Sequence, residues 1–333
     1  MSPGFPKSLP KSLPEFQRMF PSDRACAEYL EALRWSNGFA CPHCGVADEP
    51  YRFEARPGVL RCRTCRRDVA LTAGTVMERT HTPLSTWFWA SYLVSSLTPG
   101  ISATQFQRQL GLSRYETAFQ ILHKLRAGMV DPDRDLIGGK YEVELDETYV
   151  GGSTKGEGRG VTHQILVAGA VEIRHSGDAK PRGAGAHAPQ RGETWAGRLR
   201  LAIVPSRKQT ALEKFVKGAI APKTQITTDG WQGYENLAAL GYKHIAIVMK
   251  DDHEKADAWL PMIHIVFSNL KTWLLGTHHG VSPQHLQSYL DEYVFRFNRR
   301  FYPFNAFNSV LGIGVQDRSL TYDQLYAKGG KTK

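Results

Sequence analysis

Four cysteines in two short pairs constrain this chain more than any other feature. They stand as Cys41-x-x-Cys44 and Cys62-x-x-Cys65. Each pair directs two thiolates at one point, and the residues between the pairs let the second knuckle fold back to complete a tetrahedral site. Because four thiolates leave no open coordination position, we expect Cys41, Cys44, Cys62 and Cys65 to form a zinc ribbon around a structural zinc ion. The fifth cysteine, Cys26, is expected to be a buried or free thiol.

Arginines surround the second cysteine pair at Arg61, Arg63, Arg66 and Arg67. Guanidinium groups placed there can reach phosphates, although a purely architectural ribbon is the alternative. The net charge of +10 and the isoelectric point near 9.4 favour a polyanionic partner. Charge alone does not separate nucleic acid from an anionic membrane surface. Since no segment resembles an amphipathic membrane helix, we expect these four arginines to contact DNA.

The length and composition describe a globular chain with several packed regions. The 333 residues are 41% hydrophobic, which suffices for more than one core. No apolar run approaches the roughly 20 residues that span a bilayer, and the N-terminus lacks the apolar segment of a signal peptide. Cysteines with metal-ligand spacing fit a reducing compartment. The sequence therefore predicts a cytoplasmic protein with no membrane partner.

The region around the ribbon has helical patterns. Residues 15–34 predict a helix with Ser22 and Asp23 as caps, and residues 84–97 predict an apolar helix whose aromatic side chains belong to a core. Residues 102–110 and 114–126, joined by a tight break at Gly111, have the outline of a helix-turn-helix. The second helix would bring Arg114, Lys124 and Arg126 toward DNA. The alternative is an ordinary helical hairpin.

A linker at residues 131–139 precedes a change from helical to strand patterns. The pattern predicts three consecutive strands and then alternating helices and strands, which is the element order of an RNase H-like fold. The expected strands are 141–150, 164–173, 198–204, 224–228 and 244–248, and the expected helices are 210–220, 233–240, one from residue 261, and 286–297. Residues 174–194 are expected to form a surface loop.

Carboxylates on two of these strands suggest chemistry. Val143 and Leu145 face one way, so Glu144 and Asp146 share the opposite face of the strand. An acidic pair in mid-strand is costly unless a cation lies nearby. Asp229 ends a second strand, which neighbours the first in an RNase H-like sheet. Carboxylates held that way can ligate two hard divalent ions about 4 Å apart, which activate the attacking oxygen and stabilise the leaving oxygen of a phosphodiester.

Taken together, these motifs resemble the bacterial insertion-sequence DDE transposases with an N-terminal zinc ribbon, the ISXO-type group related to Merlin elements. The resemblance covers most of residues 40–300. It rests on the cysteine ribbon, Leu145-Asp-Glu-Thr-Tyr-Val-Gly-Gly152, Thr228-Asp-Gly-Trp-Gln-Gly-Tyr234, His264-Ile-Val-Phe-Ser-Asn-Leu-Lys271, Trp273-Leu-Leu-Gly-Thr-His-His-Gly280 and Tyr289-Leu-Asp-Glu-Tyr-Val-Phe-Arg-Phe-Asn-Arg-Arg300. It implies a nucleoid-associated enzyme that moves a DNA element by hydrolysis and strand transfer.

The third metal ligand is where the chain departs from that group. The group has a glutamate here and a lysine two helical turns later on the same face, and this chain has His264 and Lys271. We expect Asp146, Asp229 and His264 to hold two Mg²⁺ or Mn²⁺ ions, with Mn²⁺ favoured because imidazole is softer than carboxylate. Asn269 is the alternative third ligand, since an amide oxygen is hard. Lys271 would hold a phosphate, unless it is a plain surface lysine.

We therefore expect a multidomain α+β chain whose catalytic domain is an RNase H-like α/β fold with a mixed sheet. The segments are an N-terminal helical segment (1–35), a zinc ribbon (36–72), a helical, helix-turn-helix-like DNA-binding region (80–130), the catalytic domain (140–305) and a C-terminal tail (306–333). The expected partners are the terminal repeats of the element and target DNA. A homodimer or higher oligomer is expected because two DNA ends must be synapsed.

Two other functions fit parts of this pattern. A catalytically inactive DNA-binding regulator derived from a transposase would explain the histidine in place of glutamate. A plain RNase H-like nuclease would cut DNA without joining ends, but it would not need the long basic N-terminal half.

Overall fold

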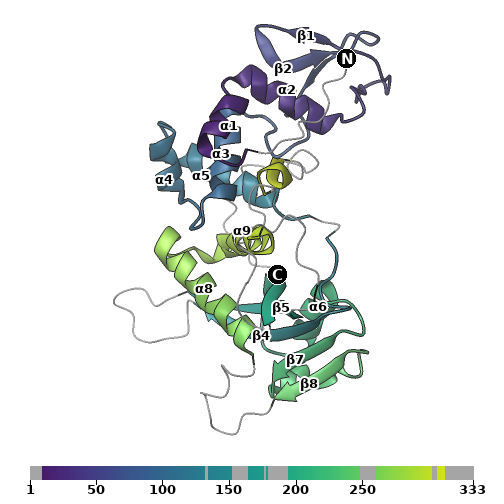
Figure 1. The fold of residues 1–333 in the computed structure, drawn as a ribbon, viewed down its shortest axis with the longest axis vertical. Helices are drawn as coiled ribbons and strands as arrows, with labels where there is room; N and C mark the ends of the chain where they lie inside the picture. Colours follow the sequence, from purple (N-terminus) through teal and green to yellow (C-terminus); the bar gives the residue numbers. More distant parts are fainter. Residues whose placement is uncertain are drawn as a thin grey trace, which may run out of the picture. The chain divides into compact units, whose positions relative to one another are not determined.

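The chain forms two compact units, one of residues 1–131 with 303–333 and one of residues 132–302 (Figure 1). The computed structural model describes residues 10–131, 134–151, 164–175, 178, 194–247, 260–301 and 306–311. Most of the expected loop at 174–194 and most of the expected tail lie outside these residues. The N-terminal helical segment, the ribbon and the helix-turn-helix-like region all belong to the first unit. Within the described residues, none of the helices has the length and apolar character needed to span a membrane.

Two short helices begin the first unit where the sequence predicted one. They are α1 (Leu13–Met19) and α2 (Asp23–Arg34). Pro21 separates them, because the residue before a proline is disfavoured in helical conformation. Ser22 then starts α2 as predicted, since its hydroxyl accepts a hydrogen bond from the backbone N–H of Ala25.

Aromatic side chains form the core of the first unit. Helix α3 (Leu84–Ser96) carries the buried residues Trp87 and Phe88, which confirms that its aromatic residues belong to a core. Residues 306–311 are helical and return to this unit. Phe307 lies at ring-centroid distances of 5.6 to 6.4 Å from Phe16, Phe20, Tyr29, Phe88 and Tyr92. The segment expected to be an uninformative tail therefore begins with a core element.

The ribbon and the predicted helical pair complete the first unit. Three antiparallel strands carry the ribbon: β1 (Tyr51–Phe53), β2 (Arg56–Arg61) and β3 (Asp68–Ala70). The helical pair consists of α4 (Ala103–Gln109) and α5 (Tyr115–Ala127). Gly111, with φ of +61°, lies in the break between them, as a left-handed turn residue should. Two helices joined by a tight break are thus present where the sequence predicted them.

A five-stranded mixed sheet organises the second unit. Its strands are β4 (Glu142–Val150), β5 (Ile165–His175), β6 (Thr194–Ile203), β7 (Gln225–Asp229) and β8 (Lys243–Ile247). The strand order is β6-β5-β4-β7-β8, in which β4, β5 and β6 pair antiparallel and β7 and β8 run parallel to β4. The predicted neighbours β4 and β7 are adjacent, so the mixed RNase H-like sheet is confirmed.

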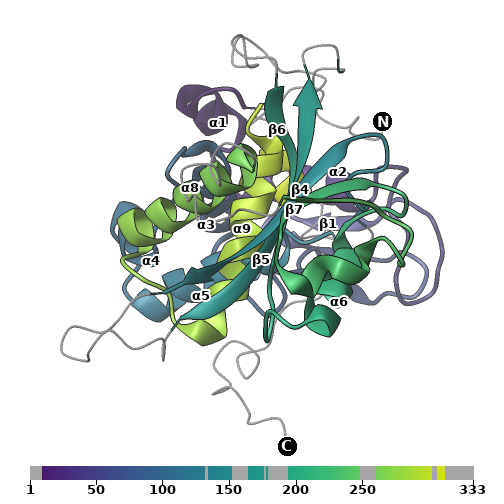
Figure 2. The same ribbon diagram turned by 90° about the horizontal axis from the view of Figure 1, so that it is seen from below.

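Helices cover both faces of this sheet (Figure 2). They are α6 (Gln209–Ala219), the 3₁₀ segment η2 (Gln232–Leu237), α8 (Pro261–His278), the 3₁₀ segment η3 (Pro283–His285) and α9 (Leu286–Arg299). The helix expected at 233–240 is thus a shorter 3₁₀ segment. Val143 and Leu145 of β4 pack in the hydrophobic cluster that includes α6. Glu144 and Asp146 therefore face the other side, where α8 and α9 pack.

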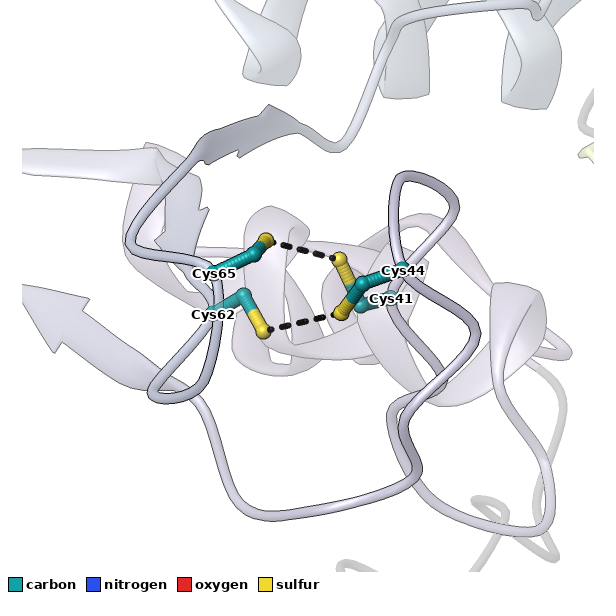
Figure 3. A group of neighbouring side chains, drawn as sticks. All are labelled: Cys41, Cys44, Cys62 and Cys65. Atoms are coloured by element: carbon teal, nitrogen blue, oxygen red, sulfur yellow. Dashed lines mark hydrogen bonds between the residues drawn. The ribbon is translucent and has the colours of Figure 1, made fainter.

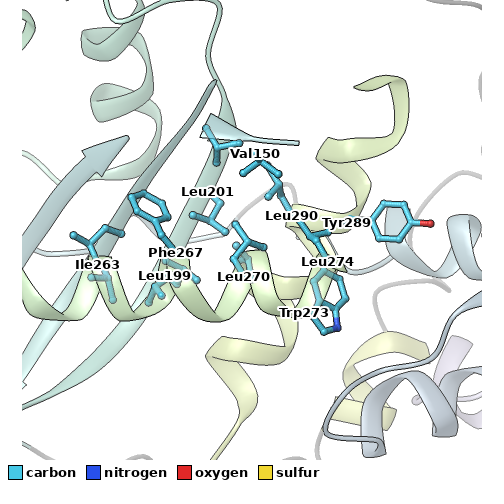
Figure 4. Packing of buried hydrophobic residues seen from close by; sticks show 14 of the residues in the cluster. Val150, Leu199, Leu201, Ile263, Phe267, Leu270, Trp273, Leu274, Tyr289 and Leu290 are labelled. Atoms are coloured by element: carbon cyan, nitrogen blue, oxygen red, sulfur yellow. The ribbon is translucent and has the colours of Figure 1, made fainter. Parts of the chain in front are cut away.

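Helix α8 approaches the sheet closely. Ile263, Phe267 and Leu270 enter a buried cluster with Leu199 and other strand residues (Figure 4). Gly169 of β5 is paired with Asp146 of β4. A Cβ atom at Gly169 would lie only 2.7 Å from Cε1 of Phe267, so the missing side chain lets α8 lie next to the strand that carries Asp146.

Candidate active site and zinc centre

The four ribbon cysteines come together as the spacing predicted (Figure 3). All four Sγ atoms lie within 4.8 Å of one another, and the pairs Cys41–Cys65 and Cys44–Cys62 are 3.6 and 3.7 Å apart. Tetrahedral Zn–S bonds of about 2.3 Å place two sulfurs about 3.8 Å apart, so the donor set fits zinc. Each knuckle is closed by a backbone hydrogen bond, from the N–H of Gly45 to the Cys41 carbonyl and from the N–H of Arg66 to the Cys62 carbonyl.

Asp146 and His264 meet across the interface between β4 and α8. Nε2 of His264 lies 3.2 Å from Oδ2 of Asp146, and both side chains are partly exposed. The other carboxylate oxygen of Asp146 accepts a hydrogen bond of 2.8 Å from the backbone N–H of Glu147. One oxygen is thus held by the strand's own backbone, while the other faces the imidazole from the helix.

Asp229 completes the set at the end of β7. Its Oδ1 atom accepts a hydrogen bond of 3.1 Å from the backbone N–H of Trp231, which fixes the turn after the strand. Burial raises the pKa of Asp229, the Trp231 N–H lowers it, and the negative charge of Asp146 raises it further. Electrostatic interactions with Arg207 and then with His264 oppose that rise in pKa. The structure therefore brings Asp146, Asp229 and His264 within electrostatic reach of one another, from three different elements.

Glu144 has a partner that the sequence did not reveal. Its Oε2 atom accepts a hydrogen bond of 2.8 Å from the backbone N–H of Ile263, in the first turn of α8. Burial raises the pKa of Glu144 to about 7, while the N–H groups of Ile263 and Met262 lower it. Carboxylates are favoured at helix N-termini because the first N–H groups lack intrahelical partners. Glu144 thus ties α8 to β4 one residue before His264.

Two comparisons with known proteins agree with this architecture. Residues 136–298 match the family of the ISXO2-like transposase domain, and residues 21–68 match the family of the transposase zinc-ribbon domain. The chain thus combines a transposase zinc-ribbon domain with an ISXO2-like transposase domain. It is also similar to a Halobacterium salinarum protein described as an uncharacterized protein in transposable element ISH50. The identity is 26% over 291 residues, which cover 84% of this chain and 92% of that protein. No solved structure matches the chain.

A second group of side chains lies beside Asp229 in this ISXO2-like domain. Glu147, whose side chain is 1% exposed, accepts hydrogen bonds from Nε of Arg207 and from the hydroxyl of Tyr234. The Arg207 guanidinium lies 4.2 Å from the ring centroid of Trp231. Trp231 and Tyr234 belong to the motif quoted for the family resemblance. Arg207 lies in a loop with no sequence signal of its own, and only the tertiary structure reveals it.

The other two candidate residues of α8, Lys271 and Asn269, lie at different angles from His264 around the helix axis. Lys271 follows His264 by two helical turns, so both lie on one side of the helix, and Lys271 is exposed. Asn269 is also exposed, but helical geometry places it about 140° around the axis from His264. The buried stripe of α8 separates the two directions, because Ile263, Phe267 and Leu270 pack on the sheet.

The four ribbon arginines are not equivalent. Arg61 forms an ion pair with Asp68, with 2.6 Å between Nε and Oδ1, and this hydrogen bond raises the pKa of Arg61. Arg63 and Arg66 lie 4.8 and 5.7 Å from the ring centroid of the exposed Tyr51. Arg67 is exposed. Arg63, Arg66 and Arg67 therefore present charge to solvent, whereas Arg61 is partly committed to the ribbon itself.

The three basic residues expected from α5 also differ. Arg114 is exposed and stands at the N-cap of the helix. Lys124 donates a hydrogen bond of 3.2 Å to the carbonyl of Glu78, and burial lowers the pKa of Lys124. Arg126 is only 1% exposed. The expectation that Arg126 faces a DNA groove is therefore wrong for this structure, because its turn of the helix packs inside the unit.

Proposed function

We propose that this chain binds the ends of its own insertion element and catalyses divalent-metal-dependent DNA cleavage and strand transfer. The observation that carries the proposal is the contact of 3.2 Å between Asp146 of β4 and His264 of α8, with Asp229 at the end of the adjacent strand β7. Carboxylate oxygens are ligands that hard divalent ions prefer. The match to the ISXO2-like transposase domain over these same elements supports the proposal.

The roles of the three residues follow from their chemistry. Asp146 and Asp229 would provide carboxylate oxygens to Mg²⁺ or Mn²⁺, and His264 would provide a ring nitrogen. When bound, two such ions activate an attacking oxygen and stabilise a leaving oxygen at a phosphodiester. Nε2 of His264 ligates only when its proton is absent, so the Nδ1–H tautomer is the form that serves. Because imidazole is neutral in that form, the site has one negative charge fewer than a three-carboxylate site and should prefer Mn²⁺.

The choice of His264 over Asn269 rests on direction. His264 contacts Asp146, whereas Asn269 leaves α8 at about 140° from it. Lys271 shares the side of His264 and would hold a phosphate next to the carboxylates. We keep Asn269 in the experiment below because an amide oxygen is a suitable ligand in principle.

The basic side chains of the first unit supply the proposed DNA contacts. Arg63, Arg66 and Arg67 of the ribbon and Arg114 at the start of α5 are exposed, so they can neutralise phosphates. Arg61 and Lys124 would contribute less, since each already has a protein partner. The zinc ion would be structural and would hold the ribbon arginines in place. A homodimer or larger assembly on DNA would bring two element ends together.

The alternative is a DNA-binding regulator that has lost catalysis. The histidine at position 264, where the family resemblance implies a glutamate, is the observation that favours it. Such a protein would bind the same DNA ends through the same first unit. Metal-dependent cleavage therefore distinguishes the two functions.

The test uses labelled duplex DNA carrying the terminal sequence of the chain's own element, with Mg²⁺ or Mn²⁺. Wild type is compared with Asp146→Ala, His264→Ala and Asn269→Ala. We expect cleavage by wild type and by Asn269→Ala, and no cleavage by the other two variants, while all four bind the DNA. If wild type binds the ends and cleaves them with neither metal, the regulator is the better description.

A further inference from the structure

Arg207 lies beside the proposed metal ligands without being one of them. It is in the loop between β6 and α6, and its NH2 atom is 3.9 Å from Oδ2 of Asp229. This is an ion-pair distance but too long for a direct hydrogen bond. If Arg207 served only to neutralise Asp229, we would expect a direct hydrogen bond between the two side chains. The geometry instead leaves the NH2 atom without a hydrogen bond to Asp229.

Among the residues that the structure describes, few hydrogen-bond acceptors contact Arg207. Its Nε atom donates to Glu147, but within the described residues no hydrogen bond involves its NH1 or NH2 atom. The side chain is 34% exposed. Arg198 of β6 shows the contrast, because its Nε and NH2 atoms donate to the buried Glu172 and its NH2 atom also donates to the Leu136 carbonyl. The guanidinium group of Arg198 is therefore used to stabilise the fold, whereas the NH1 and NH2 atoms of Arg207 can donate to a ligand.

The guanidinium group of Arg207 is nevertheless held in place by neighbouring side chains. Glu147 fixes the Nε side, the Trp231 ring packs against the guanidinium, and the indole N–H of Trp231 donates 3.0 Å to the backbone carbonyl of Arg207. A Cβ atom at Gly233 would lie 2.7 Å from that same carbonyl oxygen, so the close approach depends on glycine. A donor fixed in this way needs no reorganisation when an anion arrives, which is the condition for strong electrostatic stabilisation.

We propose that Arg207 binds the DNA phosphate that enters the site of Asp146 and Asp229, by donating from its NH1 and NH2 atoms to non-bridging oxygens of that phosphate. Planar guanidinium groups match phosphate oxygens in pairs, which a lysine cannot do. The inference rests on the proposed function, because that function brings a phosphodiester to these carboxylates. It assigns the site a substrate contact that is supplied by a protein cation.

The experiment measures binding as well as cleavage. Duplex DNA with the element end is prepared with either a normal phosphate or a neutral methylphosphonate at the junction between element and flanking DNA. A third duplex carries the methylphosphonate outside the junction. Affinity is measured in Ca²⁺, and cleavage in Mg²⁺ or Mn²⁺, for wild type, Arg207→Lys and Arg207→Gln.

Two further variants separate substrate contact from folding. Arg207→Gln leaves the buried Glu147 without its cation, so Arg207→Gln is also made together with Glu147→Gln. Lys217→Gln on α6 removes a positive charge from an exposed side chain of the same unit and is the charge-matched control. Thermal unfolding of each variant reports whether the fold is kept.

We expect the junction methylphosphonate to weaken wild-type binding about tenfold, as loss of a hydrogen bond to a charged group does. In Arg207→Gln and in the double variant the same replacement should have little further effect, because the group that senses the charge is gone. Arg207→Lys should keep part of the affinity and lose about 100-fold in cleavage. Lys217→Gln should behave as wild type.

The inference is overturned if the junction methylphosphonate weakens the folded Arg207 variants as much as wild type. That result alongside active wild-type cleavage would leave the proposed function intact. The opposite result is also possible: wild type does not cleave, but the junction methylphosphonate weakens binding by wild type and not by the Arg207 variants. That result would contradict the proposed function and support the phosphate contact.

Discussion

Replacing Gly169 with alanine tests whether close packing of α8 positions His264. Gly169 is paired with Asp146, and an added Cβ atom would lie 2.7 and 2.8 Å from Cε1 and Cζ of Phe267 and 3.0 Å from Cδ1 of Ile263. Carbon atoms pack without strain at about 3.5 Å or more. Both neighbours are held in a buried cluster, so α8 should recede from the sheet by roughly 1 Å.

The same shift would separate the two proposed ligands. A recession of roughly 1 Å would lengthen the contact of 3.2 Å between His264 and Asp146 to roughly 4 Å, beyond hydrogen-bonding distance. Misplacement by 1 Å costs about 100-fold in rate at a catalytic site. Overpacking a core usually costs about 1 to 3 kcal/mol of stability. We therefore expect Gly169→Ala to remain folded, to lose about 100-fold in cleavage and to bind DNA ends normally.

Gly276→Ala on the same helix is the matched control, because a Cβ atom there would have nothing within 4 Å. Alanine in a helix interior should stabilise it by about 0.5 to 1 kcal/mol, with cleavage unchanged. The measurements are thermal unfolding and single-turnover cleavage of labelled element-end DNA. A Gly169→Ala protein that cleaves as fast as Gly276→Ala would refute the argument that backbone proximity at Gly169 positions His264.

Three further outcomes follow from the structure. Removing zinc with a chelator, or Cys62→Ser, should unfold the ribbon and abolish end binding, which circular dichroism and zinc release would report. Glu144 has a folded-state pKa of about 7 against an ordinary 4.5, so the folded state holds its proton more tightly and stability should fall by about 3 kcal/mol as pH rises from about 4.5 to about 7. Glu144→Gln should flatten that dependence in unfolding experiments without added Mg²⁺ or Mn²⁺, and an unchanged pH profile would exclude Glu144 as its source. Arg114→Ala should weaken DNA binding similarly for all sequences and reduce the salt slope by about one, and an unaltered slope would remove Arg114 from the interface.

The sequence predicted the order of the elements well because periodic patterns are local. All five strands of the second unit lie within a few residues of their expected positions, and the expected neighbours β4 and β7 are adjacent. The local exceptions have local causes. Pro21 divides the first helix, and residues 232–237 form a 3₁₀ segment in place of a longer helix. Segments that return from a distance were not predictable in this way, as Phe307 shows by packing in the N-terminal core.

The partners of charged side chains were much harder to predict, since they depend on the assembled fold. Arg126 follows a helical DNA-contact pattern but is buried, and Glu144 accepts a hydrogen bond from the backbone of a helix more than a hundred residues away. His279 at the C-cap of α8 adopts a left-handed conformation with φ of 55°. Local sequence indicates where a charge stands on its element but not which element packs against it.

The charges around the site also bear on the histidine at position 264, where the family resemblance implies a glutamate. Glu144, Asp146 and Glu147 on β4 and Asp229 on the adjacent strand β7 already place four carboxyl groups on two neighbouring strands. Arg207 offsets part of that charge, and the N-terminus of α8 stabilises Glu144. A fifth carboxyl group at position 264 would face Asp146 at close range and repel it whenever no metal is bound. An imidazole there contacts Asp146 instead, so the two proposed ligands stay together without a metal. The histidine therefore has a structural reason of its own, and its presence is not by itself evidence of lost catalysis.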